Sequence, residues 1–178
     1  MRWEALFGDL EAQFEDAARD LDDDLVVDLA EAEMARAALS DRLRARRGHP
    51  LTIRLVDGSD VRGVVVDAAP QWLLVGEGQR RVLVPLEAVV AAWPLGEVAP
   101  EPGGVERRLR IGHALRALAR EEARVVVRTM AGEHRGWILR VRLDHVDVHV
   151  EGPQVPGQAG SRAVVTVALR HLLTVRTS

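Results

Sequence analysis

One pattern of short apolar segments and glycines occurs twice in this chain of 178 residues, and the repeat limits the possible folds more than any other feature. The matched pairs are Ile53 and Val127, Arg54 and Arg128, Gly58 and Gly132, Arg62 and Arg135, Gly63 and Gly136, Leu73 and Val146, Val75 and Val148, Val82 and Val165, Val84 and Val167, Leu86 and Leu169, Val89 and Leu172, and Val90 and Leu173. Residues 151–162 lengthen the second copy, and their Gly and Pro content predicts an exposed loop. The repeat therefore favours two small domains of one kind.

The apolar segments of each copy have the length and residue types of β-strands. Five strands are predicted in the first copy, at 51–56, 61–67, 72–75, 81–84 and 89–93. Gly58 relieves the tight turn after the first strand. Gly63 lies where the second strand bends so sharply that a side chain would obstruct closure of a small barrel. The predicted fold class is α+β, mainly β, with two tandem five-stranded small barrels.

Helical periodicity precedes both copies. Two runs of residues recur at spacings of four and three. They are Trp3, Phe7, Leu10, Phe14, Ala17 and Leu21, followed by Leu25, Leu29, Ala32, Arg36, Leu39 and Leu43, and Arg36 is the one polar interruption of the apolar stripe. The junction at residues 22–24 is either a stutter in one N-terminal helix or the turn of a helical hairpin. The apolar stripe would pack on the barrels or dimerise as a coiled coil or hairpin, and both alternatives remain open. A short inter-barrel helix is predicted at about 105–122.

These elements divide the chain into four parts. They are an acidic amphipathic helical region at 1–47, a first barrel at 50–93, a linker at 94–104, and a helix with the second barrel at 105–177.

Charge is distributed unevenly, although the net charge is only −3. Residues 1–33 hold twelve acidic residues and two arginines, whereas arginines exceed acids in the rest of the chain. This division suits an anionic partner for the basic part, or an acidic helix lying on a basic face of the same or another chain. The chain has no Cys, no signal-peptide pattern and no apolar run of about 20 residues, so a cytoplasmic location is expected and membrane insertion is not.

The first glycine pair belongs to a longer motif at residues 53–67. Its apolar positions, including Ile53 and Leu55, precede Gly58 and Gly63 at a fixed spacing, and the motif ends at Asp67. The motif follows a helix and resembles the first signature of the Sm-like family, which includes Hfq. The resemblance implies a small Sm-like or SH3-like barrel. It also implies edge-to-edge assembly, in which the fourth strand of one barrel pairs with the fifth strand of its neighbour and covers open strand edges.

The chain departs from the family at positions that matter for RNA. The Asn that commonly follows the Asp of the first signature is missing, because Asp67 is followed by Ala68 and Ala69. The Arg-Gly pair of the second signature is replaced by Val84-Pro85 in the first copy and by Val167-Ala168 in the second. The family's RNA site is therefore not transferred to this chain residue by residue.

Candidate nucleic-acid contacts are instead chosen by residue type. Arg54, Arg62, Arg128 and Arg135 could contact phosphate, and Trp72 could stack on a base. The alternative for Trp72 is an anchor in the core or at an interface. A second arginine group, Arg42, Arg44, Arg46 and Arg47 with Arg107, Arg108 and Arg110, could bind phosphate or, in its first part, form a solvated helix end.

Patterns for catalysis and metal binding are weak. There is no glycine-rich phosphate loop, no serine elbow and no His–acid pair at helical metal spacing. His145, Asp147 and His149 would share one face of a strand and could ligate a metal, but they also fit the solvent face of a strand whose other face is core. An enzyme is therefore not expected, and no catalytic residue, metal or cofactor is predicted.

Two functional hypotheses follow. In the first, an Sm-like homo-oligomer binds RNA through the arginines. In the second, the chain is a structural or regulatory protein–protein interaction module without nucleic acid, and its N-terminal helix docks a protein partner.

Overall fold

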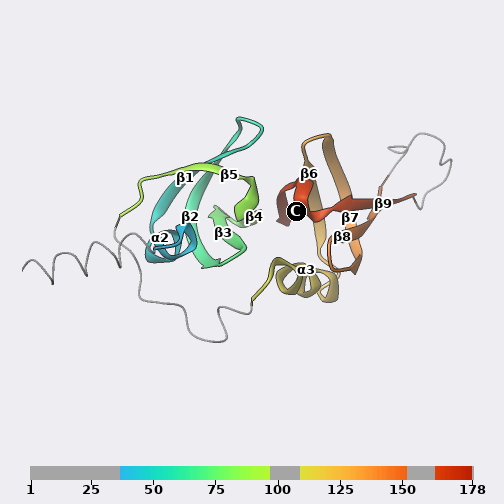
Figure 1. The fold of residues 1–178 in the computed structure, drawn as a ribbon. Helices are drawn as coiled ribbons and strands as arrows, with labels where there is room; N and C mark the ends of the chain where they lie inside the picture. Colours follow the sequence, from blue (N-terminus) through green and yellow to red (C-terminus); the bar gives the residue numbers. More distant parts are fainter. Residues whose placement is uncertain (1–36, 97–108, 152–162, 178) are drawn as a thin grey trace, which may run out of the picture. The chain divides into compact units, whose positions relative to one another are not determined.

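The computed structural model describes residues 37–96, 109–151 and 163–177 (Figure 1). The chain divides into two compact units, Met1–Ala37 and Ala38–Ser178, and the description below concerns the second. The predicted N-terminal helix or hairpin, most of the linker and the loop at 152–162 lie outside the described residues. The predictions made for those segments therefore stay predictions.

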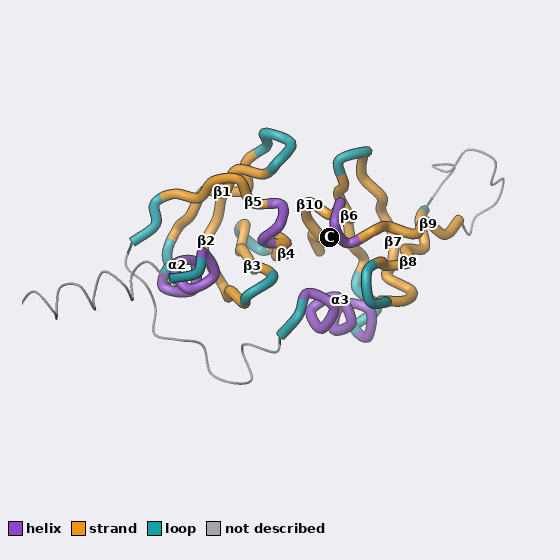
Figure 2. The backbone as a smooth tube through the Cα atoms, in the orientation of Figure 1, coloured by secondary structure: helices purple, strands orange, loops and turns teal. Residues whose placement is uncertain are grey.

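Antiparallel strand pairs dominate the described residues (Figure 2). The strands are β1 Pro50–Leu55, β2 Asp60–Ala69, β3 Trp72–Glu77, β4 Arg80–Pro85, β5 Val89–Trp93, β6 Arg124–Thr129, β7 Gly132–Val141, β8 His145–Val150, β9 Ala163–Ala168 and β10 Leu172–Thr177. The α-helices are α2 Leu39–Ala45 and α3 Ile111–Arg120, and short 3₁₀ turns, η1 Leu86–Ala88 and η3 Leu169–His171, precede β5 and β10. The prediction of an α+β, mainly β fold is confirmed.

The strands form one sheet in the order β5-β1-β2-β3-β4-β10-β6-β7-β8-β9. We call residues 38–96 the first half and residues 109–177 the second half. In each half the fifth strand pairs with the first, which is followed by the second, third and fourth. The ten strands leave the sheet open, with β5 and β9 at its edges.

Strand register confirms the residue matches made from the sequence. Leu73 lies opposite Val84, and Val75 lies opposite Val82. In the second half their matches, Val146 with Val167 and Val148 with Val165, are paired in the same way. The internal repeat is thus a repeat of strand pairing as well as of residue type.

The paired glycines have the two roles expected from the sequence. Gly58 has φ +80°, in the left-handed region that favours glycine. A Cβ at Gly63 would lie 2.3 Å from the carbonyl oxygen of Gly76, and a Cβ at Gly136 would lie 1.7 Å from that of His149. The second strand of each half therefore approaches the third too closely for any side chain.

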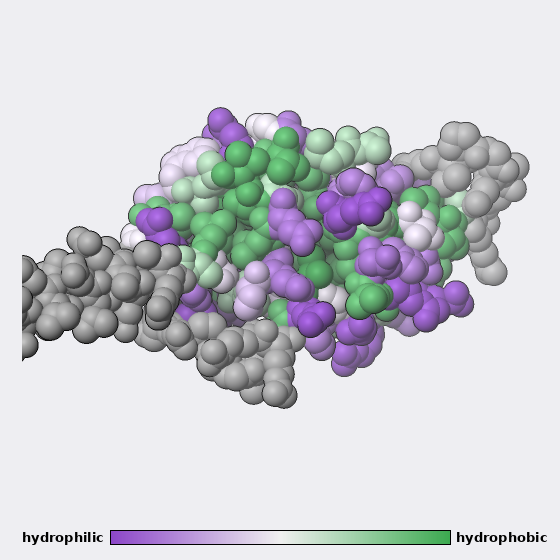
Figure 3. Space-filling view, viewed as in Figure 1, coloured by the Kyte–Doolittle hydropathy of each residue, from purple (hydrophilic) through white to green (hydrophobic). Residues whose placement is uncertain are grey.

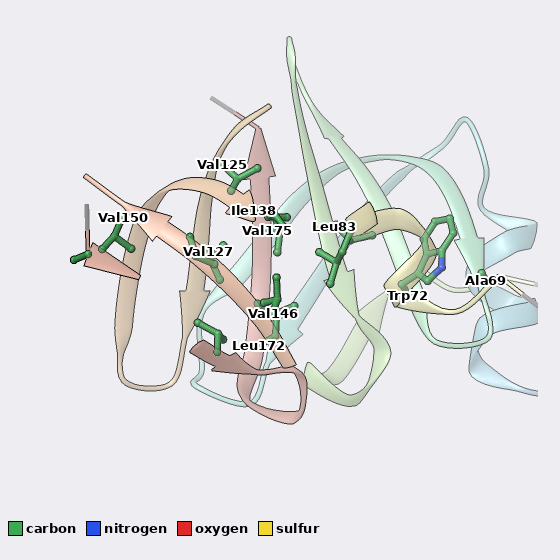
Figure 4. Packing of buried hydrophobic residues seen from close by; sticks show 14 residues of the cluster. Ala69, Trp72, Leu83, Val125, Val127, Ile138, Val146, Val150, Leu172 and Val175 are labelled. Carbon is green, nitrogen blue, oxygen red and sulfur yellow. The ribbon is translucent and has the colours of Figure 1, made fainter. Parts of the chain in front are cut away.

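Two hydrophobic clusters form the core, and both contain residues of the two halves. One combines Trp72 and Leu83 of the first half with second-half residues such as Val127 (Figure 4). The other fills the first half and includes Leu173 from β10. The halves are joined because β4 pairs with β10, where Leu83 lies opposite Val175. Burial of one such side chain contributes about 1.5–3 kcal/mol.

Each half begins with an α-helix that packs on its second strand. Helix α2 packs on β2 and buries Leu43 completely, and α3 packs on β7 and buries Leu115 completely. Helix α3 begins at Ile111, where the backbone N–H of Arg110 donates to Nδ1 of His113 over 3.2 Å. None of the described helices has the length and apolar character needed to cross a bilayer.

Candidate interaction surfaces

Arg54 and Arg62 lie together on the β1–β2 pair and share one carboxylate. Arg54 donates from Nε and Nη2 to the two oxygens of Asp60, at 2.8 and 3.1 Å, and Arg62 donates to Asp60 over 3.2 Å. The hydrogen bond with Asp60 raises the pKa of Arg54, and the hydrogen bond from Arg54 lowers the pKa of Asp60. One positive charge therefore remains in excess, and the Arg62 side chain is the freer, at 74% exposed.

Arg128 occupies the position that matches Arg54, but its partners belong to the other half. It forms an ion pair with Asp57, and its Nη1 donates to Oγ of Ser59 over 3.0 Å. The hydrogen bond from Ser59 and the charge of Arg128 lower the pKa of Asp57. Arg128 therefore links β6 to the turn between β1 and β2.

Arg135 lies on β7 and shares the carboxylate of Glu133 with another arginine. Its guanidinium is 3.9 Å from Glu133, which also accepts a hydrogen bond of 3.1 Å from Arg176 on β10. The four predicted arginines thus divide among three carboxylates. Arg54 and Arg62 are brought together, whereas Arg128 and Arg135 have separate carboxylate partners, and sequence reasoning did not predict the Asp57, Ser59 and Glu133 partners.

The prediction that Trp72 stacks on a base is not supported by its position. Trp72 is only 7% exposed and belongs to the core cluster that spans the two halves. Its indole Nε1–H donates to the carbonyl oxygen of Leu109 over 3.0 Å, which anchors the segment before α3. A base would have to displace core residues to reach the ring, so the alternative of a core anchor is correct for Trp72.

The first arginines of the second group also contact the protein. Arg42 and Arg46 donate to the carbonyl oxygens of Gly96 and Pro50, at 3.3 and 2.9 Å. Arg44 pairs with Asp41, and Arg47 pairs with Asp67. Arg107 and Arg108 lie outside the described residues.

The fifth strands of the two halves have opposite environments. β10 lies between β6 and β4, whereas β5 has only β1 beside it in the described sheet. Leu173 on β10 is accordingly 1% exposed, whereas its match Val90 on β5 is 64% exposed. Figure 3 shows apolar surface over the part of the first half that holds β1 and β5.

The fourth strands of the two halves, β4 and β9, also differ in burial. Leu83 on β4 is buried where β10 pairs with it. Its equivalent on β9 is Thr166, which is exposed and donates to Asp147 over 2.7 Å, and Val164 on β9 is 43% exposed. The sheet therefore ends in two edges of complementary type, a fifth strand at β5 and a fourth strand at β9.

The histidine positions on β8 alternate with core residues, as the solvent-face interpretation predicts. His145 pairs with Asp144 over 2.7 Å, and this hydrogen bond lowers the pKa of Asp144. The ring of His149 lies 5.7 Å from that of Trp137. Within residues 37–96, 109–151 and 163–177, no group of three His, Cys, Asp or Glu side chains is arranged to hold a metal.

No model of a known protein family matches this chain, and no curated protein shows significant similarity to it.

Proposed function

We propose that this chain is a non-enzymatic, Sm-like assembly module of the cytoplasm, in which each half is a small barrel and copies of the chain join edge to edge. The observation that carries the proposal is the pairing of β4 with β10, which joins a fourth strand to a fifth strand inside one chain. The outer strands of the sheet that the structure describes, β9 and β5, are again a fourth and a fifth strand. The β9 edge of one copy can therefore repeat the internal junction with the β5 edge of the next.

The exposure of the two edges supports this mode of assembly. The internal junction buries Leu173 and Leu83, whereas the free edges expose Val90 and Val164. Unpaired backbone groups beside apolar side chains favour pairing with another strand. The contact joins two different surfaces, so it produces a ring if the rotation between copies closes and a filament if it does not.

The mass of the full-length protein in solution tests the proposal. We expect light scattering to give a multiple of the 19.6 kDa chain mass. Val90→Lys places a charge on the β5 edge, and Val164→Lys places one on the β9 edge. Each variant should raise the dissociation constant of the oligomer at least about tenfold, because a desolvated charge is costly. The matched control is Val64→Lys, since Val64 is also 43% exposed but lies on the interior strand β2.

Two results would contradict assembly through these edges. One is a wild-type mass of 19.6 kDa at tens of micromolar protein. The other is equal loss of the oligomer in the Val64→Lys control.

RNA binding is a second candidate function, and one local arrangement favours it. The Arg54 guanidinium lies 5.4 Å from the ring centroid of Trp93, which is exposed at the end of β5 near the largely exposed Arg62. A phosphate contact to Arg62 and a base stacked near Trp93 fit this surface better than a base at Trp72.

Fluorescence anisotropy with a single-stranded RNA oligonucleotide tests this candidate. Affinity should fall steeply with added salt, and Arg62→Gln should reduce the salt slope by about one, because one phosphate contact is lost. Arg135→Gln is the matched control, since Arg135 is similarly exposed but lies on β7. Binding that is absent, independent of salt, or equally weakened by both variants would leave the assembly function alone.

A further inference from the structure

Four arginines that the sequence analysis did not single out line one open cleft of about 500 Å³. Arg116 and Arg120 come from α3, Arg140 comes from β7, on which α3 packs, and Arg142 directly follows the end of β7. Ala119, Leu139 and Val141 complete the lining. Residues four apart on a helix are neighbours on one face, so Arg116 and Arg120 lie on the α3 wall, and Arg140 and Arg142 lie on the opposite wall.

Among the residues that the structure describes, no carboxylate pairs with the arginines of this cleft. Within the described part of the chain, none of the four side chains has an ion pair or a hydrogen bond. Asp147 lies opposite Arg140 in the strand register. Its carboxylate accepts a hydrogen bond from Thr166 and does not pair with Arg140. Arg54, Arg62, Arg128 and Arg135, in contrast, each meet a carboxylate.

Unbalanced like charges around one cleft favour an anion that binds between them. The guanidinium group donates in a planar fork that matches phosphoryl oxygens in a bidentate manner. One phosphoryl group meets one wall, whereas two or three linked phosphoryl groups can meet both. An extended nucleic-acid strand would place only a small part of its charge in the cleft.

We propose that the cleft between α3 and β7 binds a compact polyphosphate, either free or as the polyphosphate part of a nucleotide, through Arg116, Arg120, Arg140 and Arg142. This site is separate from β5 and β9, so ligand binding does not rest on the proposed assembly.

Calorimetric titration of the full-length protein with inorganic tripolyphosphate tests the site, with inorganic orthophosphate and ATP as further ligands. Tripolyphosphate should bind more tightly than orthophosphate, because it can reach both walls. The double variant Arg116→Gln and Arg140→Gln removes one arginine from each wall. It should weaken tripolyphosphate binding by about a hundredfold, on the basis of about tenfold for each lost charge-assisted contact.

The matched control is the double variant Arg80→Gln and Arg81→Gln, which removes the same charge from two exposed arginines of β4 outside the cleft. Its affinity should stay within about threefold of the wild type if only long-range charge changes. Circular dichroism checks that both double variants fold. If the glutamine variant unfolds, Arg116→Lys with Arg140→Lys keeps the charge without the fork and should lose about tenfold.

Three results would overturn the proposal. They are no tripolyphosphate binding by the wild type, equal weakening in the control variant, and binding of a single-stranded oligonucleotide to the cleft without binding of tripolyphosphate. ATP binding with the same dependence on Arg116 and Arg140 supports a nucleotide source, and tripolyphosphate binding alone supports a free polyphosphate. The titration is repeated with Val90→Lys, which weakens assembly. Unchanged tripolyphosphate binding by this variant shows that ligand binding does not depend on assembly.

Discussion

At the residue scale, two glycines decide how closely the strands of each half approach. The positions of Gly63 and Gly136 leave no space for a methyl group, because the carbonyl oxygens of the neighbouring strand occupy that space. The glycine spacing in the sequence was a correct indication of this constraint. It indicated the need for glycine without showing which atoms would collide.

The tighter of the two positions gives a stability prediction. Gly136→Ala should lower the free energy of unfolding by about 1–3 kcal/mol, because β7 and β8 must move apart. Gly112→Ala is the control: its nearest neighbouring atom is 3.7 Å away, on Arg116, and alanine in a helix is expected to stabilise by about 0.5–1 kcal/mol. Urea denaturation of the two variants measures both effects. Equal midpoints for Gly136→Ala and the wild type would contradict the steric explanation.

Residue type alone did not show which partners the candidate arginines have. Arg54 and Arg128 match in sequence, yet one pairs within its own half and the other pairs with Asp57 of the first half. The arginines of the cleft could have been found from their i, i+4 spacing at Arg116 and Arg120 and their i, i+2 spacing at Arg140 and Arg142. Their convergence could not, because it depends on the packing of α3 against β7.

At the element scale, the fifth strands of the two halves differ in their number of paired neighbours. β10 exchanges hydrogen bonds with strands on both sides, and β5 does so on one side only within the described sheet. Edge strands expose alternate backbone N–H groups, so their stability differs from that of interior strands with the same sequence pattern.

Amide hydrogen exchange measures this difference. In a single-chain form such as Val164→Lys at low concentration, the outward amides of β5 should exchange on the order of tenfold or more faster than the matching amides of β10. In the wild-type assembly, β5 should gain protection, because β9 of another copy pairs with it. Equal protection of the two strands in the single-chain form would show that β5 is already covered.

At the scale of the whole molecule, the succession of strands along the chain and their repetition in two copies could be predicted from the sequence. Local alternation of apolar and polar residues specifies strands, and glycines at equivalent places specify equivalent bends. The predicted strand ranges of the first half differ from the observed ones by one or two residues at their ends. β1 is Pro50–Leu55 rather than 51–56, and β2 extends over Asp60–Ala69. These properties depend on neighbours in the chain, which is why the sequence by itself determined them.

The tertiary structure alone decided which edges are joined and which arginines come together. The resemblance to Sm-like proteins implied pairing of fourth and fifth strands, but the choice of β4 with β10 depends on contacts between residues about 90 positions apart. The burial of Trp72 and the convergence of four arginines between α3 and β7 depend on the same kind of packing. Such contacts join segments that no local pattern connects, and so they were fixed only when the two halves folded together.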